Sequence, residues 1–161
     1  MRRFRQWHCV FAAVLVVAGG RLVASAGQPP GTIEQRAQGA ERIVVASIAD
    51  IRAAYERNAY GDELIVSHAS LTLEEVIKGN RDTATVAVTG GTVNGITLRV
   101  SSLPTLSPGE RAVFFLNRRS DGEYVPHLQG QGILKLDATN HVKGSSLSLD
   151  DIRRMARADA R

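Results

Sequence analysis

The chain has one cysteine and few aromatic residues, and both scarcities exclude classes of function. The only cysteine, Cys9, lies inside an apolar run near the start of the 161-residue chain. A single cysteine gives no intramolecular disulfide and no cysteine-based zinc site. Aromatic residues make up 5% of the chain, which leaves few platforms on which the bases of a single-stranded nucleic acid could stack.

Residues 1–26 have the three parts of a secretory signal peptide. The positive residues of its first part are Arg2, Arg3 and Arg5. An apolar run over 9–18 follows, and the small residues of the sequence ASA end at Ala26. We therefore expect cleavage between Ala26 and Gly27 and an exported protein, periplasmic or secreted. An uncleaved anchor is the alternative, but Arg21 interrupts the apolar run before it reaches the ~20 residues of a membrane span.

The excess of basic over acidic residues belongs to this signal peptide. The whole chain has 20 basic and 16 acidic residues. The signal peptide contains four of the basic residues and no acidic one, so the mature chain has equal numbers of both. The positive footprint of a nucleic-acid-binding protein is thus absent. No second apolar segment of membrane length follows, and we expect no membrane span after cleavage.

We expect a flexible lead-in over residues 27–41 and a single domain over residues 42–161. The lead-in begins with the segment GQPPG and continues with small and polar residues. The mature chain is long enough to bury roughly two-thirds of its surface around one core. The sequence shows no internal repeat.

The most apolar strand-like run is 109–116. Its residues Val113 and Phe115 would point to one face of a strand, and Phe114 and Leu116 to the other. A strand that is apolar on both faces is covered on both sides. We therefore expect this run to be central in the fold.

Further strands are predicted from runs that alternate or are rich in β-branched residues. They cover residues 42–48, 64–77, 84–88, 96–101, 124–125 and 132–136. The segment 52–63 is a helical turn or a hairpin connection, and its Gly-Asp pair favours the hairpin. The alternation slips by one residue at 74–76, as a β-bulge produces. In the run 96–101, we expect Ile96 and every second residue after it to point inward.

The end of the chain changes to the helical period. Ser148 and Asp151 fit a capping box at the start of a helix predicted over 147–157. The apolar residues of this helix recur on one stripe; they are Leu149, Ile152, Met155 and Ala156. The sequence thus predicts a mainly β fold, a small OB-like barrel of five to seven strands with a C-terminal α-helix.

The order of motifs resembles a group of uncharacterised exported bacterial proteins with an OB-like barrel, related in shape to the netrin-like domain of tissue inhibitors of metalloproteinases. The motifs are LTLEEVIKG at 71–79, GGTVNGITLRV at 90–100, LSPGER at 106–111 and VFFL at 113–116. The resemblance covers roughly residues 42–136 and implies the barrel fold. Structural glycines and strand residues specify a fold better than a function. The inhibitors use an N-terminal cysteine and disulfides, which the mature chain lacks, so their mechanism is transferred to no residue here.

We find no catalytic, cofactor-binding or metal-binding constellation in the sequence. His68, His127 and His141 lie on separate stretches without the spacing of a zinc site. No G-x-S-x-G motif marks a nucleophilic serine. The glycines of 90–95 lack a following Lys-Ser/Thr, so they predict a hairpin rather than a phosphate-binding loop. We accordingly expect no cofactor, no metal and no enzymatic activity.

One candidate binding loop remains, formed by Tyr55, Arg57 and Tyr60 between the first two long strands. OB-like barrels often bind through this loop; the alternative is that the tyrosines cap one end of the core. Our leading hypothesis is an exported binding module for an unknown protein or envelope component. The alternatives are an oligosaccharide-binding OB-like domain and an enzyme with a site assembled from distant strands. A pocket that brings His68 or His127 to a carboxylate would favour the enzyme.

Overall fold

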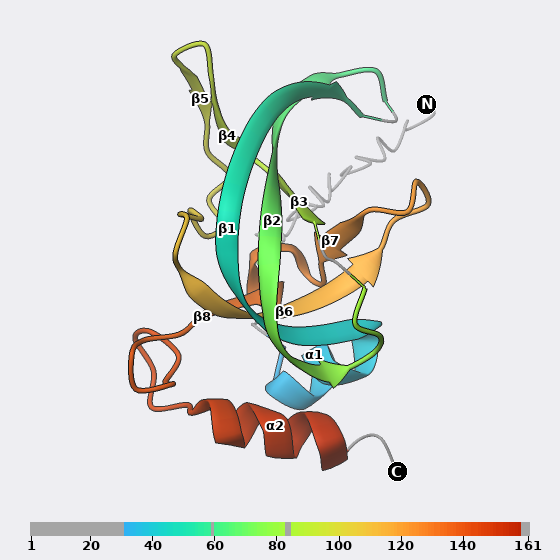
Figure 1. The fold of residues 1–161 in the computed structure, drawn as a ribbon. Coiled ribbons are helices and arrows are strands. Elements are labelled where there is room, and N and C mark those ends of the chain that lie inside the picture. Colours follow the sequence, from blue (N-terminus) through green and yellow to red (C-terminus); the bar gives the residue numbers. More distant parts are fainter. Residues whose placement is uncertain (1–30, 59, 83–84, 159–161) are drawn as a thin grey trace, which may run out of the picture.

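The structure is a computed structural model that describes residues 31–58, 60–82 and 85–158. The predicted signal peptide (1–26) and its cleavage site between Ala26 and Gly27 lie outside the described residues. The fold is mainly β and ends in an α-helix, as predicted (Figure 1). The strands are β1 (Arg42–Arg57), β2 (Glu63–Lys78), β3 (Thr85–Thr89), β4 (Gly91–Val93), β5 (Ile96–Leu98), β6 (Arg111–Arg118), β7 (Tyr124–Pro126) and β8 (Ile133–Lys135). The helices are α1 (Ile33–Gly39), the short 3-10 helix η1 (Gln129–Gly132) and α2 (Leu149–Ala158).

Six of the strands form one sheet in the order β1-β2-β3-β7-β6-β8. β1 also pairs with β6, so β1 has neighbours on both edges. All of these pairings are antiparallel except that of β3 with β7, which is parallel and joins Val86 to Tyr124. The remaining two strands, β4 and β5, form a separate hairpin.

Strand β6 is covered on both faces, which confirms the prediction that it is central. Phe114 and Leu116 belong to a core cluster with residues of β1, β2 and β3. Val113 and Phe115 belong to a second cluster with residues of α1 and α2. All four side chains are fully buried. The two helices therefore cover one face of β6, and the other strands cover the opposite face (Figure 1).

The segment 52–63 belongs to a hairpin, as the Gly-Asp pair indicates. β1 and β2 pair along a long curved ribbon, and their connection is only Asn58–Asp62 (Figure 1). The predicted bulge is present as well. Val45 faces Glu75 and Ala46 faces Leu73, so Glu74 is an extra residue in β2.

The lead-in differs from the prediction, because α1 lies within 27–41. Thr32 accepts a hydrogen bond from the Gln35 backbone N–H, and the Gln35 side chain accepts one from the Thr32 N–H. This capping box starts the helix. Ala37 and Ala40 are buried against the second core cluster, so the helix is packed onto the sheet. None of the helices in the described ranges is both long and apolar enough to cross a membrane.

The run 96–101 also differs from the prediction. Ile96 is 61% exposed instead of pointing inward, and β5 ends at Leu98. The reason is that β5 pairs with β4 alone and is not part of the large sheet. Its alternating residues therefore share a face, but no second layer covers Ile96.

Candidate functional site

Two cavities lie beside β3, on either side of the segment 99–103. The first cavity has a volume of about 320 Å³ and lies between the β4–β5 hairpin, β1, β2 and the loop 99–106. The second cavity has a volume of about 340 Å³ and lies between β2, β3, β7 and the start of η1. They share part of their lining, namely Val88, Thr89, Val100 and Leu103. The two cavities are therefore neighbours with a common wall.

The glycines between β3 and β4 shape the first cavity. Gly90 and Gly91 have φ of 114° and 132°, in the region that side chains disfavour. A Cβ on Gly91 would lie 2.3 Å from the Ser67 hydroxyl oxygen. That hydroxyl donates a hydrogen bond of 2.6 Å to the Gly90 carbonyl. The chain can therefore turn back closely over β2, as only glycine permits.

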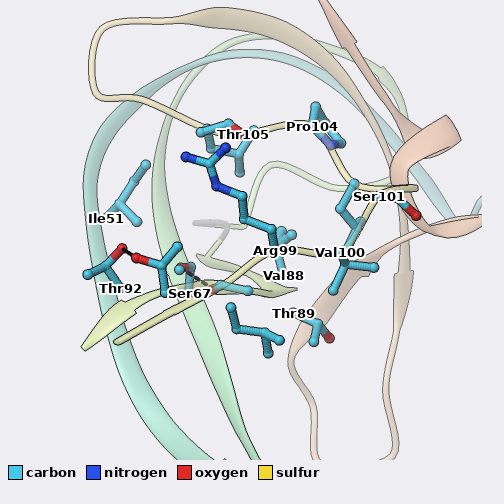
Figure 2. A pocket seen from close by; sticks show the side chains of 16 residues that line it. Ile51, Ser67, Val88, Thr89, Thr92, Arg99, Val100, Ser101, Pro104 and Thr105 are labelled. Carbon is cyan, nitrogen blue, oxygen red and sulfur yellow. Dashed lines mark hydrogen bonds between the residues drawn. The ribbon is translucent and has the colours of Figure 1, made fainter. Parts of the chain in front are cut away.

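The turn of the β4–β5 hairpin confirms the prediction made from the glycines of 90–95. Asn94 and Gly95 both have positive φ, 50° and 81°, as a type I′ turn requires. The hydroxyls of Thr92 and Thr97 are hydrogen-bonded across the hairpin at 2.9 Å. This hairpin forms one wall of the first cavity (Figure 2).

The wall between the cavities is held by η1. A Cβ on Gly130 would lie 1.7 Å from the Ser102 carbonyl oxygen, so a glycine is needed for this approach. The Ser102 hydroxyl donates a hydrogen bond of 3.0 Å to the Gln129 side chain. The segment QGQG at 129–132 thus forms a 3-10 helix that anchors this wall.

Arg99 is the only charged residue that lines the first cavity in the described part of the chain. Its side chain extends across the cavity toward Thr105 (Figure 2). It is exposed and makes no hydrogen bond or ion pair with a described residue. The rest of the lining is apolar or bears hydroxyl groups. The cavity thus presents one guanidinium whose N–H donors have no partner among the residues that the structure describes.

The second cavity also contains an arginine, but that arginine is already paired. The guanidinium of Arg119 lies 2.5 Å from a carboxylate oxygen of Asp121 and 2.6 Å from one of Glu123. Much of the remaining wall consists of Val66, Ala87, Val125 and Pro126. This cavity is therefore largely apolar, and its cation is neutralised.

His68 lies between two carboxylates. Its Nε2 contacts Glu56 of β1, and its Nδ1 lies 3.4 Å from an oxygen of Glu123, just before β7. His68 lines neither cavity. The structure thus gives both ring nitrogens a carboxylate partner without exposing either to a cavity.

His127 has a different environment. Its Nδ1 accepts a hydrogen bond of 3.0 Å from the Asn117 side-chain amide. Burial lowers the pKa of the ring, and the charge of Lys78 lowers this pKa further. His141 lies on another turn, 3.0 Å from the Thr139 hydroxyl. The three histidines are thus in three separate environments.

The predicted binding-loop residues lie at the far end of the β1–β2 hairpin. Tyr55 is 41% exposed and Tyr60 is 91% exposed. Neither belongs to a core cluster, and neither they nor Arg57 line a cavity. Sequence reasoning missed Arg99 and Thr89, which flank the glycine-rich hairpin. The signal that could have found Arg99 is an arginine directly after a predicted glycine hairpin.

Among the residues that the structure describes, no three or more His, Cys, Asp or Glu side chains are grouped so that they could hold a metal ion. The described residues that line the cavities include no aromatic side chain. Comparison with protein-family profiles gives no match, and a search of curated proteins gives no significant one.

Proposed function

We propose that the chain is an exported, non-enzymatic binding module with an OB-like barrel, and that its partner binds at the two cavities beside β3. Export rests on the signal peptide features of residues 1–26. The partner is an unknown protein or envelope component.

The strand pairings support the barrel. Followed from β1 through β2, β3, β7 and β6, they return to β1. With β4–β5 set aside as an insertion and the five remaining strands renumbered along the sequence, their order in space is 1-2-3-5-4. The OB barrel is likewise built from five strands in a partly open Greek key.

One observation carries the location of the site: residues of β2 and β3 line both cavities, and the second cavity also reaches the β6–β7 loop. Such barrels bind on the face of strands 2 and 3 and through the loops after strands 1 and 4. The second cavity is lined by Val66 of β2 and Thr89 of β3. Arg119, which also lines it, lies in the β6–β7 loop, the counterpart of the loop after strand 4.

The lining favours a polypeptide or a small molecule over an oligosaccharide or a nucleic acid. The bases of a single-stranded nucleic acid bind by stacking on aromatic side chains. An oligosaccharide that stacked on aromatic rings would likewise need such rings in the lining of the two cavities. The described lining offers apolar side chains and hydroxyl groups instead.

An enzyme is the second candidate, because His68 does contact carboxylates. A general base needs a ring nitrogen within reach of the proton that it abstracts. Both nitrogens of His68 face carboxylates, and the ring lines neither cavity. A reaction catalysed by the purified chain and abolished in His68→Gln would establish this alternative.

A pair of matched variants tests the binding site. Thr89 and Thr85 are both exposed threonines at the ends of β3, but only Thr89 lines the cavities. Thr89→Trp should fill the entrance of both cavities, and Thr85→Trp should leave them open. We expect crosslinked pull-downs from the native envelope fraction to recover the same partner with the wild type and with Thr85→Trp, and to lose it with Thr89→Trp. Equal recovery with both variants, or no reproducible partner with the wild type, would contradict the proposal.

A further inference from the structure

The first cavity has an uncompensated charge. Sixteen residues line it, and Arg99 is the only one with a charged side chain. Several other arginines are paired with carboxylates: Arg111 with Glu74, Arg119 with Glu123 and Arg153 with Glu75. Arg99 has no such partner in the described chain. Its charge is therefore available to a ligand.

We propose that the first cavity binds a carboxylate that carries an apolar group, and that Arg99 holds the carboxylate. This inference rests on the proposed binding function and names the chemistry of its ligand. The guanidinium presents parallel N–H donors, which match the two oxygens of a carboxylate. A phosphate monoester carries a charge of about −1.5 to −2 at neutral pH, more than one arginine neutralises.

The other walls fit the rest of such a ligand. Apolar side chains form much of the remaining lining; they are Ile51, Val88, Leu98, Val100, Leu103, Pro104 and Leu106. The Thr105 hydroxyl lies on the same side as the Arg99 guanidinium (Figure 2), where it can donate a second hydrogen bond. The volume of about 320 Å³ is near the lower limit of small-molecule sites. A short aliphatic acid or one apolar C-terminal residue fits this description.

The carboxylate has two possible sources, a free carboxylic acid or the C-terminus of a polypeptide. Two pairs of probes distinguish them. The first pair is hexanoate and hexylamine, which share an alkyl chain and differ in charge. The second pair is the peptide Ala-Ala-Leu with a free C-terminus and the same peptide with a C-terminal amide, which differ only in the carboxylate.

The experiment is a titration of the ¹⁵N-labelled mature chain, followed by amide shifts and calorimetry. We expect hexanoate or the free peptide to shift the amides of 89–92, 98–103 and 105–106. Hexylamine and the amidated peptide should shift none of these amides. Arg99→Gln should weaken carboxylate binding at least tenfold. Arg81→Gln removes another exposed arginine without a partner among the described residues, one that lines neither cavity, and should bind as the wild type does. Tighter binding of hexanoate would identify a free carboxylic acid as the source of the carboxylate. Tighter binding of the peptide would identify the C-terminus of a polypeptide.

The charge-reversal variant Arg99→Glu distinguishes a loss of binding from a loss of folding. Because Arg99 bonds to no described residue, Arg99→Glu should melt near the wild-type temperature. It should also bind hexylamine in place of hexanoate, which a misfolded chain could not do. Undiminished carboxylate binding by Arg99→Gln, shifts that map elsewhere, or no binding of either carboxylate at millimolar concentration would overturn the inference.

The results also separate this inference from the proposed function. A partner lost in Thr89→Trp but retained in Arg99→Gln would leave the binding module intact and reject the carboxylate. Carboxylate binding that depends on Arg99, with no partner captured by the wild type, would retain the site and reject the module.

Discussion

The ring of His127 shows how one hydrogen bond fixes a protonation state. The Asn117 side-chain oxygen accepts a hydrogen bond of 3.0 Å from the Glu41 backbone N–H. The amide nitrogen of Asn117 must then face His127, and it donates to Nδ1. Nδ1 can accept this bond only when it carries no proton. The bond therefore agrees with burial and with the Lys78 charge, both of which lower the pKa of His127.

A pH dependence of stability follows. The pKa of His127 is lower in the folded chain than the ~6.5 of an unfolded one, so the unfolded chain binds more protons below neutral pH. The stabilisation is complete above the unfolded value and is lost as the pH falls through it toward the folded pKa. Urea unfolding between pH 8 and pH 5 should show this loss. The free energy of unfolding of His127→Gln should fall less steeply over the same range, and an unchanged slope would exclude His127 as the cause.

At the scale of elements, α2 is defined by its own first turn. The Asp151 backbone N–H donates to the Ser148 hydroxyl at 3.1 Å, and the Ser148 N–H donates to the Asp151 carboxylate at 3.0 Å. The Ser148 side chain is also the main cause that lowers the pKa of Asp151. The apolar stripe of the helix, including Leu149 and Ile152, then belongs to the second core cluster, together with residues of α1, β1 and β6.

Loss of this cap should be measurable. Ser148→Ala removes the acceptor of the first turn and should lower the free energy of unfolding by about 1 kcal/mol. Ser146→Ala alters an exposed serine of the preceding loop and should change it by less than about 0.5 kcal/mol. Chemical denaturation at neutral pH compares the two. Equal effects of both substitutions would show that the cap contributes nothing.

Elements with a local signal were predictable, and those that depend on distant contacts were not. β6 could be predicted from a continuous apolar run, and α2 could be predicted from apolar residues that recur with the helical period. α1 has only seven residues, and it docks partly through Arg36, whose guanidinium donates to the Gly31 and Gln131 carbonyls at 3.0 and 2.9 Å. Only its T-x-x-Q capping box was visible locally. Ile96 shows a second limit of prediction from the sequence. Alternation indicates which residues share a face of a strand, but not whether another layer covers that face.

At the scale of the whole molecule, the candidate site is a product of folding. The first cavity takes residues from β1, β2, β3, the β4–β5 hairpin and the loop 99–106. No spacing in the sequence marks residues that are brought together from so many segments. The predicted loop with Tyr55 and Tyr60, in contrast, was chosen from one local stretch, and it lies away from both cavities. A local stretch can therefore indicate an exposed loop, whereas a cavity assembled from several strands gives no local signal.

The pairing of β3 with β7 is the shortest in the six-stranded sheet. It consists of one residue pair, Val86 with Tyr124, whereas β1 and β6 pair at every position from Arg42 to Ser47. Because segments with few pairings open at lower free energy than core strands, β3 and β7 should separate without global unfolding. The cavities lie beside this contact, so its opening would alter their shape.

Native-state hydrogen exchange tests this expectation. Amides of 85–89 and 124–125 should exchange at least tenfold faster than amides of 43–46 and 112–116, which lie in strands buried on both faces. A ligand that bridges the second cavity touches both Val88 and Val125, so saturation with it should slow the first group and leave the second unchanged. Equal exchange in both groups would mean that the sheet opens as one cooperative unit. The site would then be rigid, and binding would not depend on movement between β3 and β7.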